Sequence, residues 1–121
     1  MKRRVVVGVD GGGTKTLALA AEIDGEWKGR GGAGPSNPHA VGFEPACLEI
    51  EAAIAKALED NELAALCLGL AGAGRPEDVE QFTDWARARY PGVQLRVGSD
   101  VEILLAAGAP TGAALALICG T

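Results

Sequence analysis

VVVGVDGGGTKT, residues 5–16, joins an apolar strand to a glycine-rich turn and decides the fold of this chain. Residues Arg4 to Val9 form a short β-branched run, which is typical of a strand buried on both faces. A second strand is predicted over Thr16 to Ile23, directly after the turn. The chain is therefore expected to open with two strands whose connecting turn carries three consecutive glycines.

The turn between these strands has the composition of a phosphate-binding loop. Its candidate ligands are Asp10, Gly11, Gly12, Gly13, Thr14, Lys15 and Thr16. The glycines let backbone N–H groups approach an anion closely, the threonines add hydroxyl donors, and the lysine adds positive charge. The aspartate is placed to hold Mg²⁺ through water, because magnesium prefers oxygen ligands and keeps several waters. The alternative is a plain glycine-rich hairpin turn, but so many polar donors around three glycines favour phosphate binding.

Two better-known phosphate motifs do not describe this turn. The P-loop pattern GxxxxGK[ST] is absent, and the Rossmann fingerprint requires a helix after the glycines, whereas a strand follows here.

The rest of the chain alternates strands and helices. Asp24-Gly25 is a strong hairpin signal and predicts a third strand over Glu26 to Gly31. Residues 31–42, GGAGPSNPHAVG, are expected to form a long irregular loop. The elements predicted after it are a helix at 43–59, a strand at 63–70, a helix from Pro76 to the break at 90–92, a strand at 93–97, a helix from Ser99 to about Gly108, and a strand at 113–119.

This order, βββαβαβα with one further strand, predicts an α/β fold. Strands that alternate with helices pair in parallel through crossover connections, whereas the opening strands pair antiparallel. We therefore expect a mixed five-stranded sheet with helices on its faces, followed by one strand of a second domain.

Composition and charge exclude several classes of protein. The net charge of −5 argues against nucleic-acid binding, which requires clusters of Lys and Arg. No apolar stretch approaches the roughly 20 residues that span a bilayer, so no membrane association is expected. Cys47, Cys67 and Cys119 form no CxxC pair, which indicates a reduced, cytoplasmic chain without a zinc site.

Further candidate ligand residues follow predicted strands or lie in the long loop. Asp100 comes after a parallel strand, where open α/β sheets bind ligands, and its carboxylate could accept a proton from a substrate hydroxyl. Ser99 and Glu102 also form a capping box, so this segment could simply start a helix. Asn37 could bind a polar ligand or form a turn. Gly72 ends a strand at the same sheet edge, where it either permits close backbone approach or releases the strand into a turn.

Several segments together resemble a known family. VVVGVDGGGTKT resembles the first phosphate motif of the actin-like ATPase superfamily. The later segments resemble the BadF/BadG/BcrA/BcrD ATPase family within it, especially the N-acetylglucosamine kinase branch. They are GPSNPHAVG, LCLGLAGAGRPED, VGSDVEILLAAG and ALICGT.

The resemblance implies a ribonuclease-H-like fold and an ATP-dependent sugar kinase that transfers the γ-phosphate to a sugar hydroxyl. Asp100 would be the catalytic base, and Asn37 would contact the amino sugar, with Asp100 and Gly72 beside it. Gly120 and Thr121 would begin a second phosphate motif. ATP and Mg²⁺ are the implied cofactors, and the sugar is the implied small-molecule substrate.

Two alternative functions belong to other classes. Some members of the family activate a radical acyl-CoA dehydratase through an iron–sulfur cluster, which requires cysteine ligands. A non-catalytic, nucleotide-dependent interaction module is the other alternative.

The resemblance also implies how the chain is organised. Residues 1–111 would form an N-terminal actin-like ATPase domain, and residues 112–121 would open a truncated C-terminal domain. Such an N-terminal part is expected to be inactive alone. The apolar strand at 113–119 would lack its own sheet, and unpaired strands associate, so a homodimer is expected.

Overall fold

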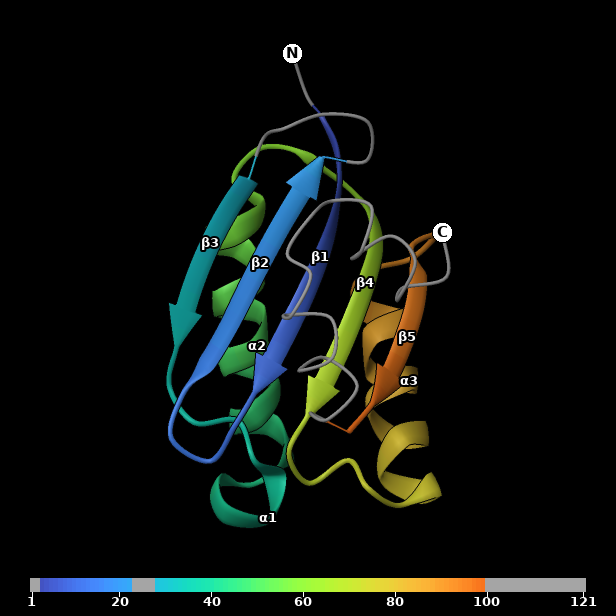
Figure 1. Cartoon of the computed structure of the whole chain (residues 1–121). Coiled ribbons are helices and arrows are strands. Elements are labelled where there is room, and N and C mark those ends of the chain that lie inside the picture. Colours follow the sequence, from blue (N-terminus) through green and yellow to red (C-terminus); the bar gives the residue numbers. More distant parts are fainter. Residues whose placement is uncertain (1–2, 23–27, 100–121) are drawn as a thin grey trace.

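The computed structural model describes residues 3–22 and 28–99, which form a mixed sheet with two long helices on one face (Figure 1). The five strands are ordered β3-β2-β1-β4-β5. The elements in chain order are β1 Arg4–Gly11, β2 Thr16–Glu22, β3 Lys28–Ala33, α1 Pro38–Val41, α2 Phe43–Leu58, β4 Glu62–Leu70, α3 Pro76–Arg89 and β5 Gln94–Gly98.

Strand direction follows the length of each connection. β1 and β2 are joined by a short turn and pair antiparallel, with Gly11 opposite Thr16, and β3 pairs antiparallel with β2. β4 pairs in parallel with β1, and β5 pairs in parallel with β4, after crossovers through α2 and α3. The predicted mixed five-stranded sheet is therefore confirmed.

The core lies between the sheet and the two long helices. Alternate residues of β1 (Val5, Val7 and Val9) belong to one buried cluster with residues of β4, α2 and α3. Because side chains alternate along a strand, Asp10 lies on the sheet face opposite these helices. None of the described helices is long and apolar enough to cross a membrane.

Helix α2 is amphipathic, as its sequence predicts. Ile50 and Ile54 are almost fully buried, and burying such a side chain contributes about 1.5–3 kcal/mol. The helix lies very close to β3, because a Cβ at Gly31 would overlap the carbonyl of Ala53 and lie 2.8 Å from the nitrogen of Ala57.

Helix α3 begins at Pro76, as predicted, and Tyr90 caps its end. Phe82 is buried beneath it and contacts Phe43 of α2 with ring centroids 5.0 Å apart. At the far end of α3, Arg89 Nε lies 3.1 Å from Glu51 Oε1 of α2. These contacts fix the two helices side by side on the sheet.

The segment at 31–42 is more regular than its glycine content suggested. β3 continues to Ala33, and Pro38–Val41 form the short helix α1, so the prediction of an irregular loop across 31–42 is wrong at both ends. Backbone pairing with β2 holds the glycine-rich strand end, and Pro38 sets the first helical residue. The hairpin at Asp24-Gly25, the helix at 99–108 and the strand at 113–119 lie outside the described residues.

Candidate functional site

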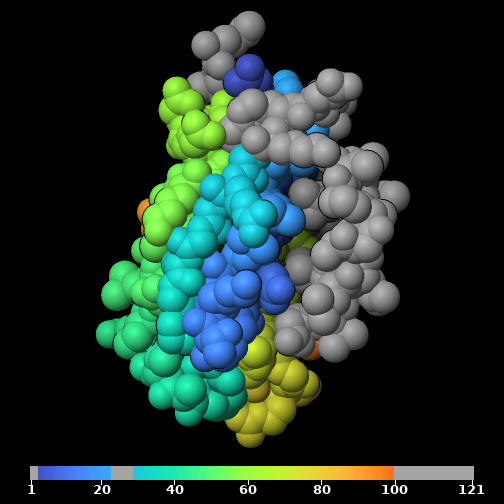
Figure 2. Space-filling model, turned by 60° about the vertical axis from the view of Figure 1, so that its left-hand side comes forward, coloured from blue at the N-terminus to red at the C-terminus, as the bar shows by residue number. Residues whose placement is uncertain are grey.

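Three chain segments meet at the edge of the sheet where β1, β4 and β5 end. They are the glycine turn at 12–15, the segment at 34–42 that leads into α2, and the β4–α3 connection at 71–75. Figure 2 shows the blue turn beside the teal segment at the lower end of the molecule, with the yellow start of α3 next to them. The carboxyl edge of parallel strands is where open α/β sheets bind ligands.

The glycine turn is closed by one hydrogen bond and presents several N–H groups. Gly12 N donates to the carbonyl of Lys15 at 2.9 Å. Among the described residues, the N–H groups of Gly13, Thr14 and Lys15 donate to no other backbone group. All three residues are exposed, and a Cβ at Gly13 would meet nothing within 4 Å. Consecutive N–H groups in an open turn form an anion-binding concavity.

Each end of the turn holds one of the predicted ligands. Asp10 is partly exposed in β1, between the register partners Leu17 and Gly69. Thr16 is 1% exposed, and its hydroxyl donates to the carbonyl of Gly34 at 2.7 Å. The hydroxyl of Thr16 therefore lies behind the turn, whereas sequence reasoning placed it among the phosphate donors.

Gly11 packs closely against the chain segments on both sides of the turn because it has no side chain. A Cβ at Gly11 would lie 2.6 Å from Ser36 Oγ and 2.7 Å from Leu70 Cδ2. Its carbonyl accepts a hydrogen bond from Ala71 N at 2.7 Å. The glycine therefore serves close packing with both flanking segments, which its phosphate-loop assignment did not foresee.

The segment at 34–42 is held against the turn by Ser36 and against α2 by Gly34. Ser36 N donates to the carbonyl of Gly12 at 3.1 Å, and Gly34 N donates to Glu49 Oε1 at 2.6 Å. Ser36 is fully buried and was not singled out from the sequence. Its role depends on contacts some 20 residues away, which leave no local pattern.

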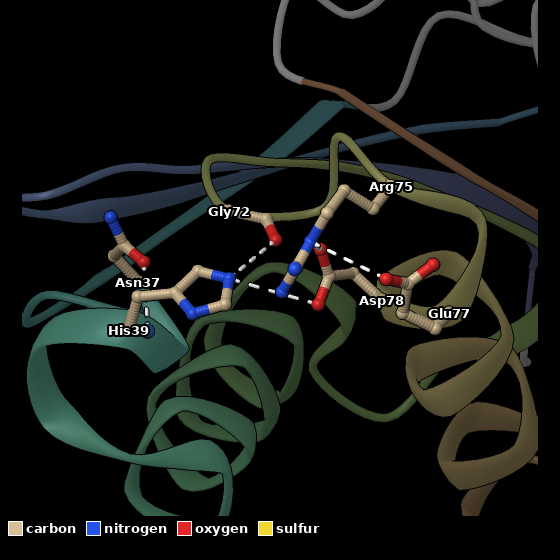
Figure 3. A network of polar contacts seen from close by, with 6 residues as sticks. All are labelled: Asn37, His39, Gly72, Arg75, Glu77 and Asp78. Atoms are coloured by element: carbon tan, nitrogen blue, oxygen red, sulfur yellow. Dashed lines mark hydrogen bonds and ion pairs between the residues drawn. The ribbon is translucent and has the colours of Figure 1, made fainter.

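Asn37 caps helix α1, which fixes the direction of its amide. Its Oδ1 accepts a hydrogen bond from His39 N at 3.0 Å. Its Nδ2 makes no hydrogen bond to the described residues, and Figure 3 shows it pointing away from His39 and Gly72. Asn37 can therefore cap the helix and still donate to a ligand, so both roles proposed from the sequence fit one geometry.

His39 connects α1 to the β4–α3 segment. Its Nε2 lies 3.2 Å from the carbonyl of Gly72 and 3.7 Å from Asp78 Oδ1 (Figure 3). Gly72 has a φ of +87°, and a Cβ there would lie 2.7 Å from Asn37 Oδ1. Both interpretations of Gly72 therefore fit the structure, because it lies in the turn after β4 and also permits close approach of Asn37, whereas a Cβ at Gly74 would meet nothing within 4 Å.

Asp78 anchors this polar network at the start of α3. Its side chain is 10% exposed, and Oδ2 accepts a hydrogen bond from Arg75 Nε at 3.2 Å. That hydrogen bond and the nearby guanidinium hold the pKa of Asp78 below its usual range, against the opposing effect of desolvation. The carboxylate stays ionised beside His39 and Arg75, which stabilises the α3 end of the network.

The structure brings together most of the predicted ligands that it describes. The glycine turn, Asn37 and Gly72 all lie at the same sheet edge. β5 ends at Gly98 and is parallel to β4, so the chain leaves β5 at this edge as well. Asp100, Gly120 and Thr121 lie outside the described residues.

Comparisons with known proteins identify a family and several relatives of this chain. Residues 7–121 match the model of the BadF/BadG/BcrA/BcrD ATPase family. The chain is 27% identical over its full length to an N-acetyl-D-glucosamine kinase of Dictyostelium discoideum, and covers 42% of that protein. It is 31% identical over 98% of its length to an N-acetylmuramic acid/N-acetylglucosamine kinase of Clostridium acetobutylicum, and covers 40% of that protein.

A solved structure is similar as well. It belongs to a protein of Chromobacterium violaceum provisionally named an N-acetylglucosamine kinase, with 26% identity and a TM-score of 0.52. The match covers 88% of this chain and 39% of that protein. The chain thus has the fold of such proteins and spans about two fifths of the length of the relatives it matches.

Proposed function

This chain belongs to the BadF/BadG/BcrA/BcrD ATPase family, and from that premise we propose that it is the N-terminal part of an ATP-dependent sugar kinase. The acceptor is N-acetylglucosamine or a related amino sugar, in keeping with the names of its relatives. One observation carries the proposal. The glycine turn and the segment bearing Asn37 are hydrogen-bonded to each other at the carboxyl edge of the sheet. A nucleotide phosphate and an acceptor bound to them would be neighbours.

The turn supplies the phosphate site. The N–H groups of Gly13, Thr14 and Lys15 have no backbone acceptor among the described residues, and Lys15 adds a positive charge. Phosphoryl transfer is catalysed mainly by positioning and by neutralisation of charge, so such a loop provides much of what the reaction needs.

Asp10 is proposed to hold Mg²⁺ through water. It is a partly exposed carboxylate one residue before the turn, and magnesium is commonly bound by one or two carboxylates together with substrate phosphates and water. The residues present therefore fit the ion. When bound, Mg²⁺ supplies neutralisation of phosphate charge.

Asn37 is proposed to orient the acceptor. Oδ1 already accepts a hydrogen bond from His39 N, whereas Nδ2 donates to none of the described residues, so we propose Nδ2 as the group that binds the ligand. A sugar hydroxyl oxygen or the carbonyl of an N-acetyl group can accept this hydrogen bond. The geometry thus favours a ligand acceptor atom at this position.

Asp100 is proposed as the general base. It would take the proton of the acceptor hydroxyl as the hydroxyl oxygen attacks the γ-phosphorus. The bond between the γ-phosphorus and the bridging oxygen then breaks, and ADP leaves. A positioned base typically contributes about 10²–10⁴-fold to the rate.

The test is an ATP-dependent phosphorylation screen of the full-length protein across hexoses, N-acetylhexosamines and N-acetylmuramic acid. We expect an N-acetylhexosamine to be the best acceptor. Asp100→Asn should lower turnover by about 10²–10⁴-fold while ATP binding is retained. Asp84→Asn, an exposed acid of α3, is the control and should keep full activity. Full turnover by the Asp100 variant would remove that residue from the mechanism.

The iron–sulfur alternative gains no support from the described cysteines. Cys47 and Cys67 are buried free thiols. Burial, together with Glu51 and Glu44, raises the pKa of Cys47 to about 12. Because the thiolate is the metal ligand, Cys47 is a poor cluster ligand.

Three further proposals rest on the sequence. The domain boundary falls near residue 111, this chain of 121 residues forms a homodimer through association of the strand at 113–119, and the protein resides in the cytoplasm. Light scattering over a range of protein concentrations tests the second of these, and a concentration-independent monomer would contradict it.

A further inference from the structure

Two buried hydroxyl groups lie directly behind the phosphate turn. Thr16 is 1% exposed and Ser36 is fully buried, and their hydroxyl oxygens are 2.7 Å apart. Neither hydroxyl reaches the open side of the turn, so neither acts directly on a phosphate. They lie between the phosphate turn and the segment that carries Asn37, which are the two proposed ligand-binding segments.

The hydrogen-bond geometry fixes the direction of each hydroxyl. Thr16 Oγ1 lies 2.7 Å from the carbonyl of Gly34 and 2.7 Å from Ser36 Oγ. A hydroxyl has one proton. Thr16 therefore donates to the carbonyl, which can only accept, and Ser36 donates to Thr16. Both protons are then used within the protein.

The same pair is enclosed by backbone. Ser36 N donates to the carbonyl of Gly12 at 3.1 Å, and a Cβ at Gly11 would lie 2.6 Å from Ser36 Oγ. Side chain and main chain of one serine thus contact both ends of the turn. Such a packed interior transmits a displacement instead of absorbing it.

The pair has one proposed ligand-binding residue on each side. Thr16 is the residue after Lys15 at the end of the phosphate turn, and Ser36 is the residue before Asn37. The segment beyond Asn37 is held by His39 at the carbonyl of Gly72. A shift of the turn is passed on to Asn37, because Ser36 is hydrogen-bonded to Gly12 and directly precedes Asn37 in the chain.

We propose that the Thr16–Ser36 hydroxyl pair is a positioning link that couples the phosphate turn to Asn37, so that nucleotide and acceptor strengthen each other's binding. This inference rests on the proposed kinase function. The link touches neither ligand. It acts through Gly12 on one side and Asn37 on the other.

A purely structural role for the pair predicts a different outcome. Loss of a buried hydrogen bond then lowers stability, but the ratio of acceptor affinities with and without nucleotide stays the same. If the pair couples the two sites, removal of either hydroxyl lowers that ratio of acceptor affinities. Binding free energies are reciprocal, so the same factor must appear whichever ligand is added first.

The experiment measures this ratio on the full-length protein by titration calorimetry. The probes are N-acetylglucosamine and the non-hydrolysable analogue AMP-PNP with Mg²⁺, each titrated in the absence and presence of the other. For the wild type we expect the analogue to tighten acceptor binding by about fivefold or more, within the usual range of such couplings. Ser36→Ala should bring the factor close to one.

A matched series separates coupling from stability. Thr16→Val removes the hydroxyl at nearly constant shape and should abolish the coupling. Thr16→Ser keeps the hydroxyl and loses only a methyl group, so it should retain the coupling even where stability falls. Thr83→Val removes a hydroxyl that donates to the carbonyl of Val79 at the same 2.7 Å in α3, and should leave the factor unchanged.

Several outcomes would overturn the link. One is an unchanged coupling factor in the Ser36 and Thr16→Val variants. Another is a coupling factor of one in the wild type although both ligands bind, which would contradict the link but not the proposed function. Absence of binding by both ligands to the wild type would instead refute the proposed function and this inference with it. Should Ser36→Ala fail to fold, the Thr16→Val and Thr16→Ser pair decides.

Discussion

Gly72 has a left-handed backbone conformation and packs directly against residues of the candidate site. Its φ of +87° disfavours any side chain, and a Cβ would lie 2.7 Å from Asn37 Oδ1 and 3.0 Å from His39 Cδ2. Gly72→Ala should therefore cost about 1–3 kcal/mol of stability through backbone strain. It should also weaken acceptor binding by displacing Asn37. Calorimetric titration with N-acetylglucosamine and urea denaturation measure the two effects.

The control for this variant lies at the opposite end of α3. Gly92 has a similar φ of +79°, but a Cβ there would meet nothing within 4 Å. Gly92→Ala should thus lose a comparable amount of stability and keep the acceptor affinity of the wild type. Equal acceptor affinity in both variants would mean that Gly72 has no part in placing Asn37.

Asp78 should make stability depend on pH at the acidic end. Its pKa is held below the usual value chiefly by the hydrogen bond from Arg75, so its carboxylate stabilises the fold above the unfolded-state pKa of about 3.9. That stabilisation is lost as pH falls through the lower folded-state pKa. Asp78→Asn should reduce stability at neutral pH and should lose less stability than the wild type on acidification. Urea midpoints across the acidic range measure this.

Glu77 provides the comparison, since its exposed carboxylate lies 3.6 Å from the same guanidinium nitrogen. Glu77→Gln should leave the stability nearly unchanged, because exposed ion pairs contribute little. A pH profile of the Asp78 variant that parallels the wild type would show that the carboxylate contributes nothing specific.

Among the secondary-structure elements, the packing of β3 on α2 depends on Gly31 having no side chain. A Cβ at Gly31 would lie 2.6 Å from Lys56 Cβ and 2.8 Å from the nitrogen of Ala57, and helix backbone cannot move aside cheaply. Gly31→Ala should destabilise the protein by about 1–3 kcal/mol, as overpacking does. Gly32→Ala is the control in the same strand, because its Cβ would make only an ordinary 3.8 Å contact. Equal urea midpoints for the two variants would contradict the close packing of β3 on α2.

The same strand shows which elements the sequence could predict. Apolar periodicity and Pro76 are local signals, so α2, β4 and α3 were found within a few residues of their bounds. Helix α1 is only four residues long and was missed, and the end of β3 was missed because Gly31 to Gly34 have no apolar pattern. Pairing with β2 and packing against α2 place these residues, and neither is visible in a local window.

The candidate site divides in the same way. Asp10 to Thr16 and Gly72 could be singled out because their residue types suit phosphate binding and close backbone contact. Asn37 could be singled out as a polar ligand or turn residue, and its assignment to a sugar came from the family resemblance. Ser36 and the pairing of His39 with Asp78 could not, since the partners are far apart in sequence. Even the inward direction of the Thr16 hydroxyl required knowledge of where Gly34 lies.

Of the residues proposed for binding, those that the structure describes lie at one edge of the sheet, and the α3–β5 connection lies at the other (Figure 1). A nucleotide on the glycine turn should therefore protect the amides of Gly13, Thr14 and Lys15 from hydrogen exchange, because these N–H groups gain acceptors they lack within the described protein. AMP-PNP with Mg²⁺ added to the full-length protein should slow their exchange, while Tyr90 to Val93 should exchange as before.

The same exchange measurement with N-acetylglucosamine tests whether the turn and Asn37 respond together. N-acetylglucosamine alone should slow exchange in the Asn37 segment, and adding both ligands should slow it further than either alone if the turn and Asn37 move together. Protection of the turn that appears equally at Tyr90 to Val93 would indicate general tightening of the fold. Unchanged exchange at Gly13 to Lys15 with nucleotide bound would place the phosphates elsewhere and would remove the glycine turn from the site.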